Sequence, residues 1–279
     1  MTFKLPKKPY HLAIFLFIIF LGVITTCWKP CQGHPGKCLL FFDTTGTVDP
    51  VQMWIWYMSL LLALCVVVGH AIKDRLAGFL IDQRNKMSLA RFQLVLWTIL
   101  LLGGILTAVL INVCLGIPDP MAIKIDQQLW ALMGISGVSL AATGLIHDNK
   151  RKQPENVTAK NKLMAWLGDN DSSNPKINVK GVLVENVKAE DASWLDLFLG
   201  EESGNGEWMD LGKVQMFIFT LVVWFGYASV LGSAIYLAVF DATGLKEFPE
   251  LSPGMVALLG ISHAAYIGNT AIPKTPVEK

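Results

Sequence analysis

Two long apolar stretches of this chain are copies of each other. The first begins at Ser88 as SLARFQ and continues as LVLWTILLLGG, and the second begins at Asp210 as DLGKVQ and continues as MFIFTLVVWFG. Because Ser and Asp are preferred N-cap residues, each copy predicts the start of a long helix. A second shared phrase follows each copy, LWALMGISGVSLAATG at 129–144 and MVALLGISHAAYIG at 255–268. The repeated unit is therefore a pair of hydrophobic helices.

The composition assigns these helices to a membrane. Only 16% of the 279 residues are charged and 53% are hydrophobic, whereas a soluble domain carries about a quarter charged residues. The deficit lies in long uncharged runs, which is the membrane pattern. The net charge of +1 gives no electrostatic indication of nucleic-acid binding, and we expect none.

Charge placement predicts the topology. Bases are concentrated between the second and third apolar runs and directly after the fourth, which places those ends in the cytoplasm. Lys4, Lys7 and Lys8 precede the first run as in a signal peptide, but no small-x-small cleavage site follows, so we expect an uncleaved helix. We expect an all-α polytopic protein with both termini inside and six spans, at about 11–27, 53–72, 92–115, 129–146, 214–240 and 255–272.

The expected domains follow the repeat. They are an N-terminal helix pair at 1–87 with an outer loop at 28–51, the first repeat at 88–146, a cytoplasmic segment at 147–209 and the second repeat at 210–279. Both repeats contain an even number of spans, so a rotation about the membrane normal should relate them, as in parallel transporter repeats.

The cytoplasmic segment is the only sizeable soluble part that the sequence predicts. Residues 147–212 carry eight bases and twelve acids, a net of −4 (8 − 12). We expect a polar linker through Asn174, a short hairpin within 176–184, and an amphipathic helix over 192–202. The apolar residues of that helix make a candidate surface for a cytoplasmic protein partner, with Trp194, Leu197 and Phe198 as its main residues.

Small residues recur on the second helix of each repeat. Gly134 and Gly137 lie in the first copy, and Gly260, Ala264 and Gly268 are four apart in the second, so they share a helix face. Small residues let helix backbones approach closely in lipid. We expect a packing seam inside one subunit; a seam between subunits or the wall of a narrow pore are the alternatives.

A few polar residues lie inside the predicted spans. Gln93 and Gln215 sit one turn inside the cytoplasmic boundary, where a glutamine bonds a neighbouring helix or lines an aqueous mouth. Ser136 and Ser262 are further candidates for a polar lining, and His263 is the one ionisable residue near the middle of a span, hence a functional candidate.

The bases next to the glutamines, Arg91 and Lys213, are expected to extend to the lipid headgroups.

The cysteines of the first outer loop favour a disulfide. Cys31 and Cys38 lie on the side expected to be oxidising, so a bridge between them is predicted. Together with Cys27 and His34 they are alternatively a loose set of metal ligands. We expect the disulfide, and no metal and no cofactor.

The two helix pairs resemble a family of bacterial inner-membrane proteins to which no activity is assigned. The shared residues are Asp210, Lys213, Gln215, Met216, Phe219 and Thr220, then Pro249, Glu250, Leu251 and the stretch 260–268. The family often has Arg and Trp where this chain has Lys213 and Phe219. The resemblance covers about half of the chain and implies a polytopic protein of a bacterial inner membrane.

The sequence contains no glycine-rich phosphate loop, no His-Glu metal motif and no nucleophile elbow, so we expect no enzyme. Acids are absent from the predicted span interiors, which disfavours a proton-coupled carrier. Three classes remain, and a membrane enzyme ranks third because the sequence shows no constellation of reactive side chains in one plane. The first is an oligomeric, channel-like or transport-related protein with a regulatory cytoplasmic loop. The second is a membrane-anchored scaffold or sensor that binds a cytoplasmic partner.

Overall fold

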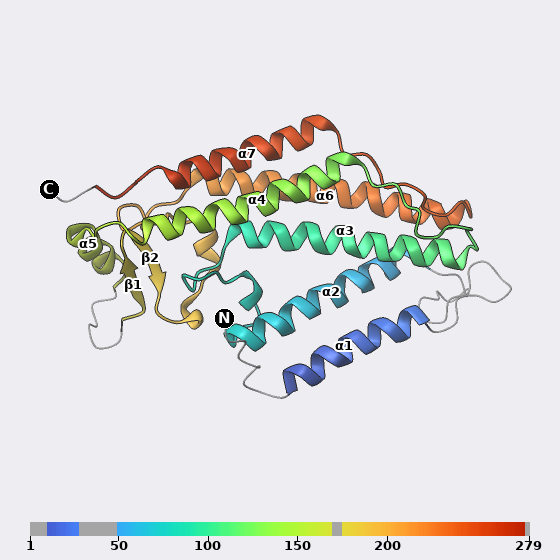
Figure 1. Ribbon diagram of the computed structural model, residues 1–279, viewed down its shortest axis with the longest axis horizontal. Coiled ribbons are helices and arrows are strands. Elements are labelled where there is room, and N and C mark those ends of the chain that lie inside the picture. The colour runs from blue at the N-terminus through green and yellow to red at the C-terminus, as the bar shows by residue number, and fades with distance from the viewer. Residues whose placement is uncertain (1–9, 28–48, 169–174, 277–279) are drawn as a thin grey trace.

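Six helices run along the long axis of the molecule (Figure 1). The computed structural model describes residues 10–27, 49–168 and 175–276. The long helices are α1 (Tyr10–Cys27), α2 (Pro50–Lys73), α3 (Leu89–Cys114), α4 (Gln127–Lys150), α6 (Leu211–Phe240) and α7 (Pro253–Ala271). The shorter elements are η1 (Gly78–Leu80), α5 (Val157–Leu167), β1 (Ile177–Lys180), β2 (Leu183–Asn186), η2 (Ala189–Asp191) and η3 (Trp194–Leu197).

Four of the described helices, α2, α3, α4 and α6, are long and apolar enough to cross a membrane. In α1 the apolar stretch at His11–Gly22 is shorter. Helix α7 is not among these four candidate spans, and its 19 residues include His263 and Asn269. The described residues thus form a mostly helical protein with four candidate spans.

The predicted helix starts are confirmed at both copies of the repeat. Ser88 is the N-cap of α3, where its hydroxyl accepts from the Arg91 amide at 3.5 Å. Asp210 is the N-cap of α6 and accepts from the amides of Gly212 at 2.9 Å and Lys213 at 3.3 Å. Both caps satisfy amides that the first helical turn leaves unpaired.

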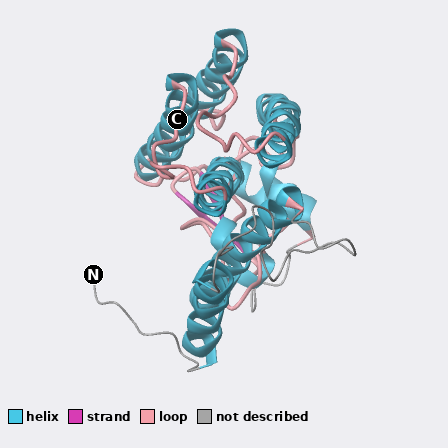
Figure 2. Ribbon diagram, turned by 90° about the vertical axis from the view of Figure 1, so that its right-hand side faces the viewer, coloured by secondary structure: helices cyan, strands magenta, loops and turns pink. Residues whose placement is uncertain are grey.

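The apolar core lies around α3, which packs against α2, α4 and α6. Trp97 and Leu100 of α3 are buried in the same core cluster as Leu231 of α6 and Leu132 of α4. In turn, α7 packs against α4 and α6. Figure 2 looks along the bundle and shows these helices nearly end-on, as separate rods.

At one end of the bundle, the connections that follow α3 and α6 pair with each other. The Lys124 amide donates to the Lys246 carbonyl at 2.8 Å, and Phe248 donates to the Lys124 carbonyl at 2.9 Å. The Asn112 side chain binds both the amide and the carbonyl of Leu245. Equivalent loops of the two copies therefore meet at the same end.

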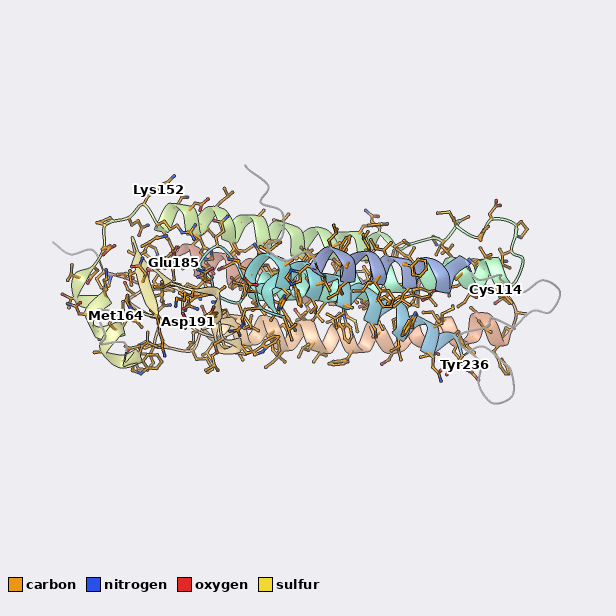
Figure 3. All side chains as sticks on the ribbon, turned by 90° about the horizontal axis from the view of Figure 1, so that it is seen from below. Cys114, Lys152, Met164, Glu185, Asp191 and Tyr236 are labelled. Atoms are coloured by element: carbon orange, nitrogen blue, oxygen red, sulfur yellow. The ribbon has the colours of Figure 1, made fainter. Side chains whose placement is uncertain are left out.

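At the opposite end, residues 151–168 and 175–209 form a cap on the helices, and Figure 3 shows Lys152, Met164, Glu185 and Asp191 there, far from Cys114 and Tyr236. The predicted hairpin is confirmed, because β1 pairs antiparallel with β2. Gly181 turns between the strands with a φ of 62°, and a Cβ there would collide with the Lys150 carbonyl at the end of α4. The hairpin thus docks closely on α4.

Two expectations for this segment are wrong. The stretch expected as a linker contains helix α5, capped by Asn156, whose side chain accepts from the Ala159 amide at 2.7 Å. The helix expected over 192–202 is only the four-residue η3. Backbone hydrogen bonds to other segments end the helix there. The Asp210 amide donates to the Phe198 carbonyl at 2.7 Å, and the Val184 amide of the hairpin donates to the Glu201 carbonyl at 2.9 Å.

Candidate functional site

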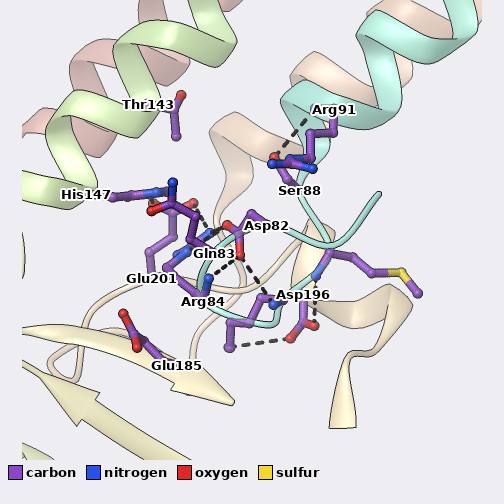
Figure 4. A network of polar contacts seen from close by, with 12 residues as sticks. Asp82, Gln83, Arg84, Ser88, Arg91, Thr143, His147, Glu185, Asp196 and Glu201 are labelled. Carbon is purple, nitrogen blue, oxygen red and sulfur yellow. Dashed lines mark hydrogen bonds and ion pairs between the residues drawn. The ribbon is translucent and has the colours of Figure 1, made fainter. Parts of the chain in front are cut away.

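A cluster of buried charged side chains joins the cap to the helix ends (Figure 4). Glu201 of the cap is at its centre and is 7% exposed. Its carboxylate lies 2.9 Å from the Lys213 ammonium, 2.6 Å from His147 Nε2 and 3.5 Å from the Arg84 guanidinium. The three partners come from α6, α4 and the α2–α3 connection. One carboxylate therefore links three separate elements.

The charge of Glu201 is stabilised where it is buried. Burial by itself would raise the pKa of this carboxyl group, but Lys213, Arg84 and His147 outweigh it and hold the pKa well below its usual value. Asp82 behaves in the same way. Burial by itself would raise its pKa, but the Arg84 guanidinium outweighs burial and the pKa is lowered. Both acids are therefore ionised at neutral pH.

Glu202, the next residue, makes a second buried link. Its side chain is 1% exposed and lies 2.5 Å from the Lys150 ammonium at the end of α4. Its other oxygen accepts from the amides of Lys274 at 2.8 Å and Thr275 at 2.7 Å, just after α7. Lys150 also donates to the Thr270 carbonyl of α7. Glu202 thereby holds the ends of α4 and α7 together.

A row of buried polar side chains runs from this cluster along α4 and α7. We call it the polar stripe; it comprises Ser136, Ser139 and Thr143 of α4 and Ser262, His263, Tyr266 and Thr270 of α7. These two helices pack against each other, and the Tyr266 side chain interacts with Thr143 and Thr270.

Part of the polar stripe has no protein partner. Ser136 Oγ, Ser139 Oγ, Ser262 Oγ and His263 Nδ1 are buried without a hydrogen bond to any described residue. Buried polar groups in proteins are nearly always bonded to protein or to water. The sequence points to Ser136, Ser262 and His263 as a polar lining, whereas the role of Ser139 and the link to the cap are seen only in the structure.

The two glutamines of the repeat differ. Gln93 is fully buried, and its amide nitrogen donates to Thr220 Oγ1 at 2.5 Å and to the Met216 carbonyl at 3.4 Å, both on α6. Gln215 is exposed. Gln93 therefore bonds a neighbouring helix, and the structure does not bring the two glutamines together.

Lys213 does not extend to the headgroups. It is 3% exposed and donates to the Leu199 carbonyl at 2.8 Å besides contacting Glu201. The expectation was wrong because the chain that leads into α6 folds so that Glu201 meets the first turn of this helix, and no pattern in the sequence reveals that contact.

The expected seam of small residues inside one subunit is not formed as predicted. A Cβ added at Gly134, Gly137 or Gly268 would meet nothing within 4 Å, and one at Gly260 would make only an ordinary contact with Ile135. Ala264 is exposed. Hydroxyl-bearing residues of the polar stripe face the bundle instead, because they occupy the inward positions of α4 and α7.

The candidate partner surface is also divided. Trp194 is 55% exposed, but Leu197 is buried with Met87, Met216 and others in a small core under the cap. Phe198 packs edge-on against Phe217 with 5.1 Å between ring centroids. Leu197 and Phe198 therefore hold the cap on the bundle. The predicted bridge between Cys31 and Cys38 lies outside the described residues.

Among the residues that the structure describes, no group of three or more His, Cys, Asp or Glu side chains is arranged to hold a metal ion. The sequence matches no protein-family model, and no similar curated protein or solved structure was found.

Proposed function

We propose that this chain is a channel-like or transport-related membrane protein that moves protons or small ions along the polar stripe. The observation that carries the proposal is the set of four buried, unpartnered polar atoms on α4 and α7. Each such atom costs about 1–3 kcal/mol when nothing bonds to it, and water is the usual partner of polar groups that the protein leaves unsatisfied. A file of water beside Ser136, Ser262 and His263 would form a conducting path.

The cap supports the same proposal. The polar stripe ends at four titratable or charged residues that form two pairs. His147 lies 2.6 Å from Glu201, and Lys150 lies 2.5 Å from Glu202. Carriers and channels use such groups to accept and release ions. The span interiors lack acids, so the two acids of the cap would act only at the helix ends.

We propose six spans in a bacterial inner membrane, with the termini and the cap in the cytoplasm and the two helix pairs related by a rotation about the membrane normal.

We further propose a homo-oligomer. Gly134, Gly137 and Gly268 have open space beside them, and small residues at a lipid-facing helix surface favour close packing of a second copy. The proposed function uses no cofactor and involves no covalent reaction.

Reconstitution tests the proposal. The purified full chain is placed in vesicles that contain a pH-sensitive dye, and proton flux is measured as a voltage is applied. His263→Ala and Ser139→Ala should reduce the flux or change its pH dependence. Ser229→Ala is the matched control, because Ser229 is exposed and bonds only its own helix, at the Phe225 carbonyl. A monomer that passes no ions at any voltage or pH would refute the channel function.

The scaffold or sensor function is favoured by one observation. Trp194 and Leu195 are 55% and 64% exposed on the cap, and an exposed aromatic residue beside an aliphatic one is typical of a protein-binding surface. Under this alternative, Trp194→Ser should prevent binding of a cytoplasmic protein and His263→Ala should not. Under the channel function, His263→Ala should change the ion flux and Trp194→Ser should not.

A further inference from the structure

A cleft of about 200 Å³ lies beside the charged cluster, where the α2–α3 connection meets the end of α4. Three arginines line it from three different elements: Arg84 from the connection, Arg91 from the first turn of α3, and Arg151 from the end of α4. Ser88 and His147 line it as well. Figure 4 shows Ser88 and Arg91 facing His147 across this space.

Two of the arginines have donors without partners. Arg84 is 4% exposed, and its Nη1 is buried with no hydrogen bond to any described residue. The Nε of Arg91 is likewise buried and unbonded, and no described acid forms an ion pair with Arg91. Guanidinium donors are seldom left unsatisfied when buried, because their desolvation is costly. The cleft therefore lacks an acceptor that its donors require.

Two acids, Asp82 and Asp148, also line the cleft, and both are already bonded to cations. Asp82 accepts from Arg84 Nε at 2.9 Å and from the Arg84 amide at 2.8 Å. Arg151 bonds Glu185 at 2.6 Å and Asp148 at 3.2 Å. These bonds fix the direction of Arg84 and Arg151, and the positive end of the α3 dipole adds to the attraction for an anion.

We infer that this cleft binds the phosphate group of an anionic ligand. Arginine forks suit phosphate oxygens, and the unpartnered donors of Arg84 and Arg91, which come from two different elements, can each bond a different oxygen of one phosphate group. A second cleft, of about 370 Å³, adjoins the first and shares Arg91 with it. Val68, Ile72 and Phe79 line this second cleft, so a phospholipid can place its headgroup at Arg91 and an acyl chain beside α2. A free phosphate would use the first cleft alone.

The test uses the full chain in a neutral detergent, with the midpoint of thermal unfolding as readout. The probes are inorganic phosphate, with sodium chloride at equal ionic strength as reference, and short-chain phosphatidic acid, with the diacylglycerol of the same chain length as reference. A shift with inorganic phosphate identifies a free phosphate as the source. A shift with phosphatidic acid alone identifies a lipid headgroup.

Arg91→Gln should weaken the apparent affinity for the effective probe by about tenfold or more, as expected for loss of a charge-assisted bond. Arg91→Lys, which keeps the charge and loses the fork, should weaken it less. Lys188→Gln is the matched control, because it removes an exposed base from the cap outside the cleft. The inference is overturned if neither phosphate probe shifts the midpoint, if diacylglycerol shifts it equally, or if Arg91→Gln binds as tightly as the wild type.

Discussion

Lys213, in the first turn of α6, lies 2.9 Å from Glu201 of the cap, and both side chains are buried. The same carboxylate contacts His147 and Arg84. A buried ion pair adds little net stability compared with apolar residues, but removing one partner leaves the other charge uncompensated. The assembly of cap and helices therefore depends on Glu201.

Replacing Glu201 with Gln should lower the free energy of unfolding by about 3–5 kcal/mol, because Lys213 and Arg84 would stay buried without their shared acid. The measurement is unfolding of the purified chain in detergent. Glu247→Gln is the control, since Glu247 and Lys124 form an ion pair that is 69% and 72% exposed. An exposed pair contributes about 0–1 kcal/mol. Equal effects of the two variants would contradict a special role for Glu201.

Stability should also fall in acid. The pKa of Glu201 is held well below the 4.5 of an ordinary glutamate, so the folded protein favours the ionised form. This contribution is fully present above the unfolded pKa and is lost as the pH falls through it toward the folded pKa. The unfolding midpoint should be steady from pH 7 to about 5 and then decline. Glu201→Gln should flatten that decline, and an unchanged slope would contradict the assignment.

The bond between Gln93 and Thr220 gives a prediction inside the bundle. Thr220→Val removes the hydroxyl that accepts from Gln93 and leaves a buried amide group without its main partner. We expect a loss of about 1–3 kcal/mol in unfolding free energy. Thr98→Val is the control at the equivalent place in the first repeat, where the side chain is only partly buried. A loss of the same size at Thr98 would show that the effect is unrelated to Gln93.

The topology predicts opposite sides for two positions. Reporter fusions at residue 45, in the first outer loop, and at residue 160, in α5 of the cap, should report the periplasmic and the cytoplasmic compartment respectively. The physical reason is the concentration of bases at the cap end of the helices. The same compartment at both positions would end the six-span topology.

The outer loop gives the last prediction. Cys31 and Cys38 should form a disulfide, which stabilises the chain by about 2 kcal/mol because the loop that it closes is short. Peptide mass analysis without reducing agent should show two hydrogens fewer on that segment. Free thiols or stoichiometric zinc would contradict the bridge.

Much of the helical framework is determined by the sequence alone. The starts of α3 and α6 follow from Ser88 and Asp210, because an N-cap bond is made within one turn of the residue that provides it. The hairpin expected within 176–184 from alternation forms at 177–186, and Gly181 permits its tight turn. These features depend on residues that are neighbours in the chain.

Only the tertiary structure decided which polar residues matter together. Lys213 and Lys150 have the sequence context of bases at a membrane surface, yet they are buried against Glu201 and Glu202, which are distant from Lys150 along the chain. Likewise, the repeat makes Gln93 and Gln215 equivalent in sequence, but one is buried against Thr220 and the other is exposed. Burial and charge pairing depend on which elements pack at each position, and that is a property of the folded chain rather than of any local pattern.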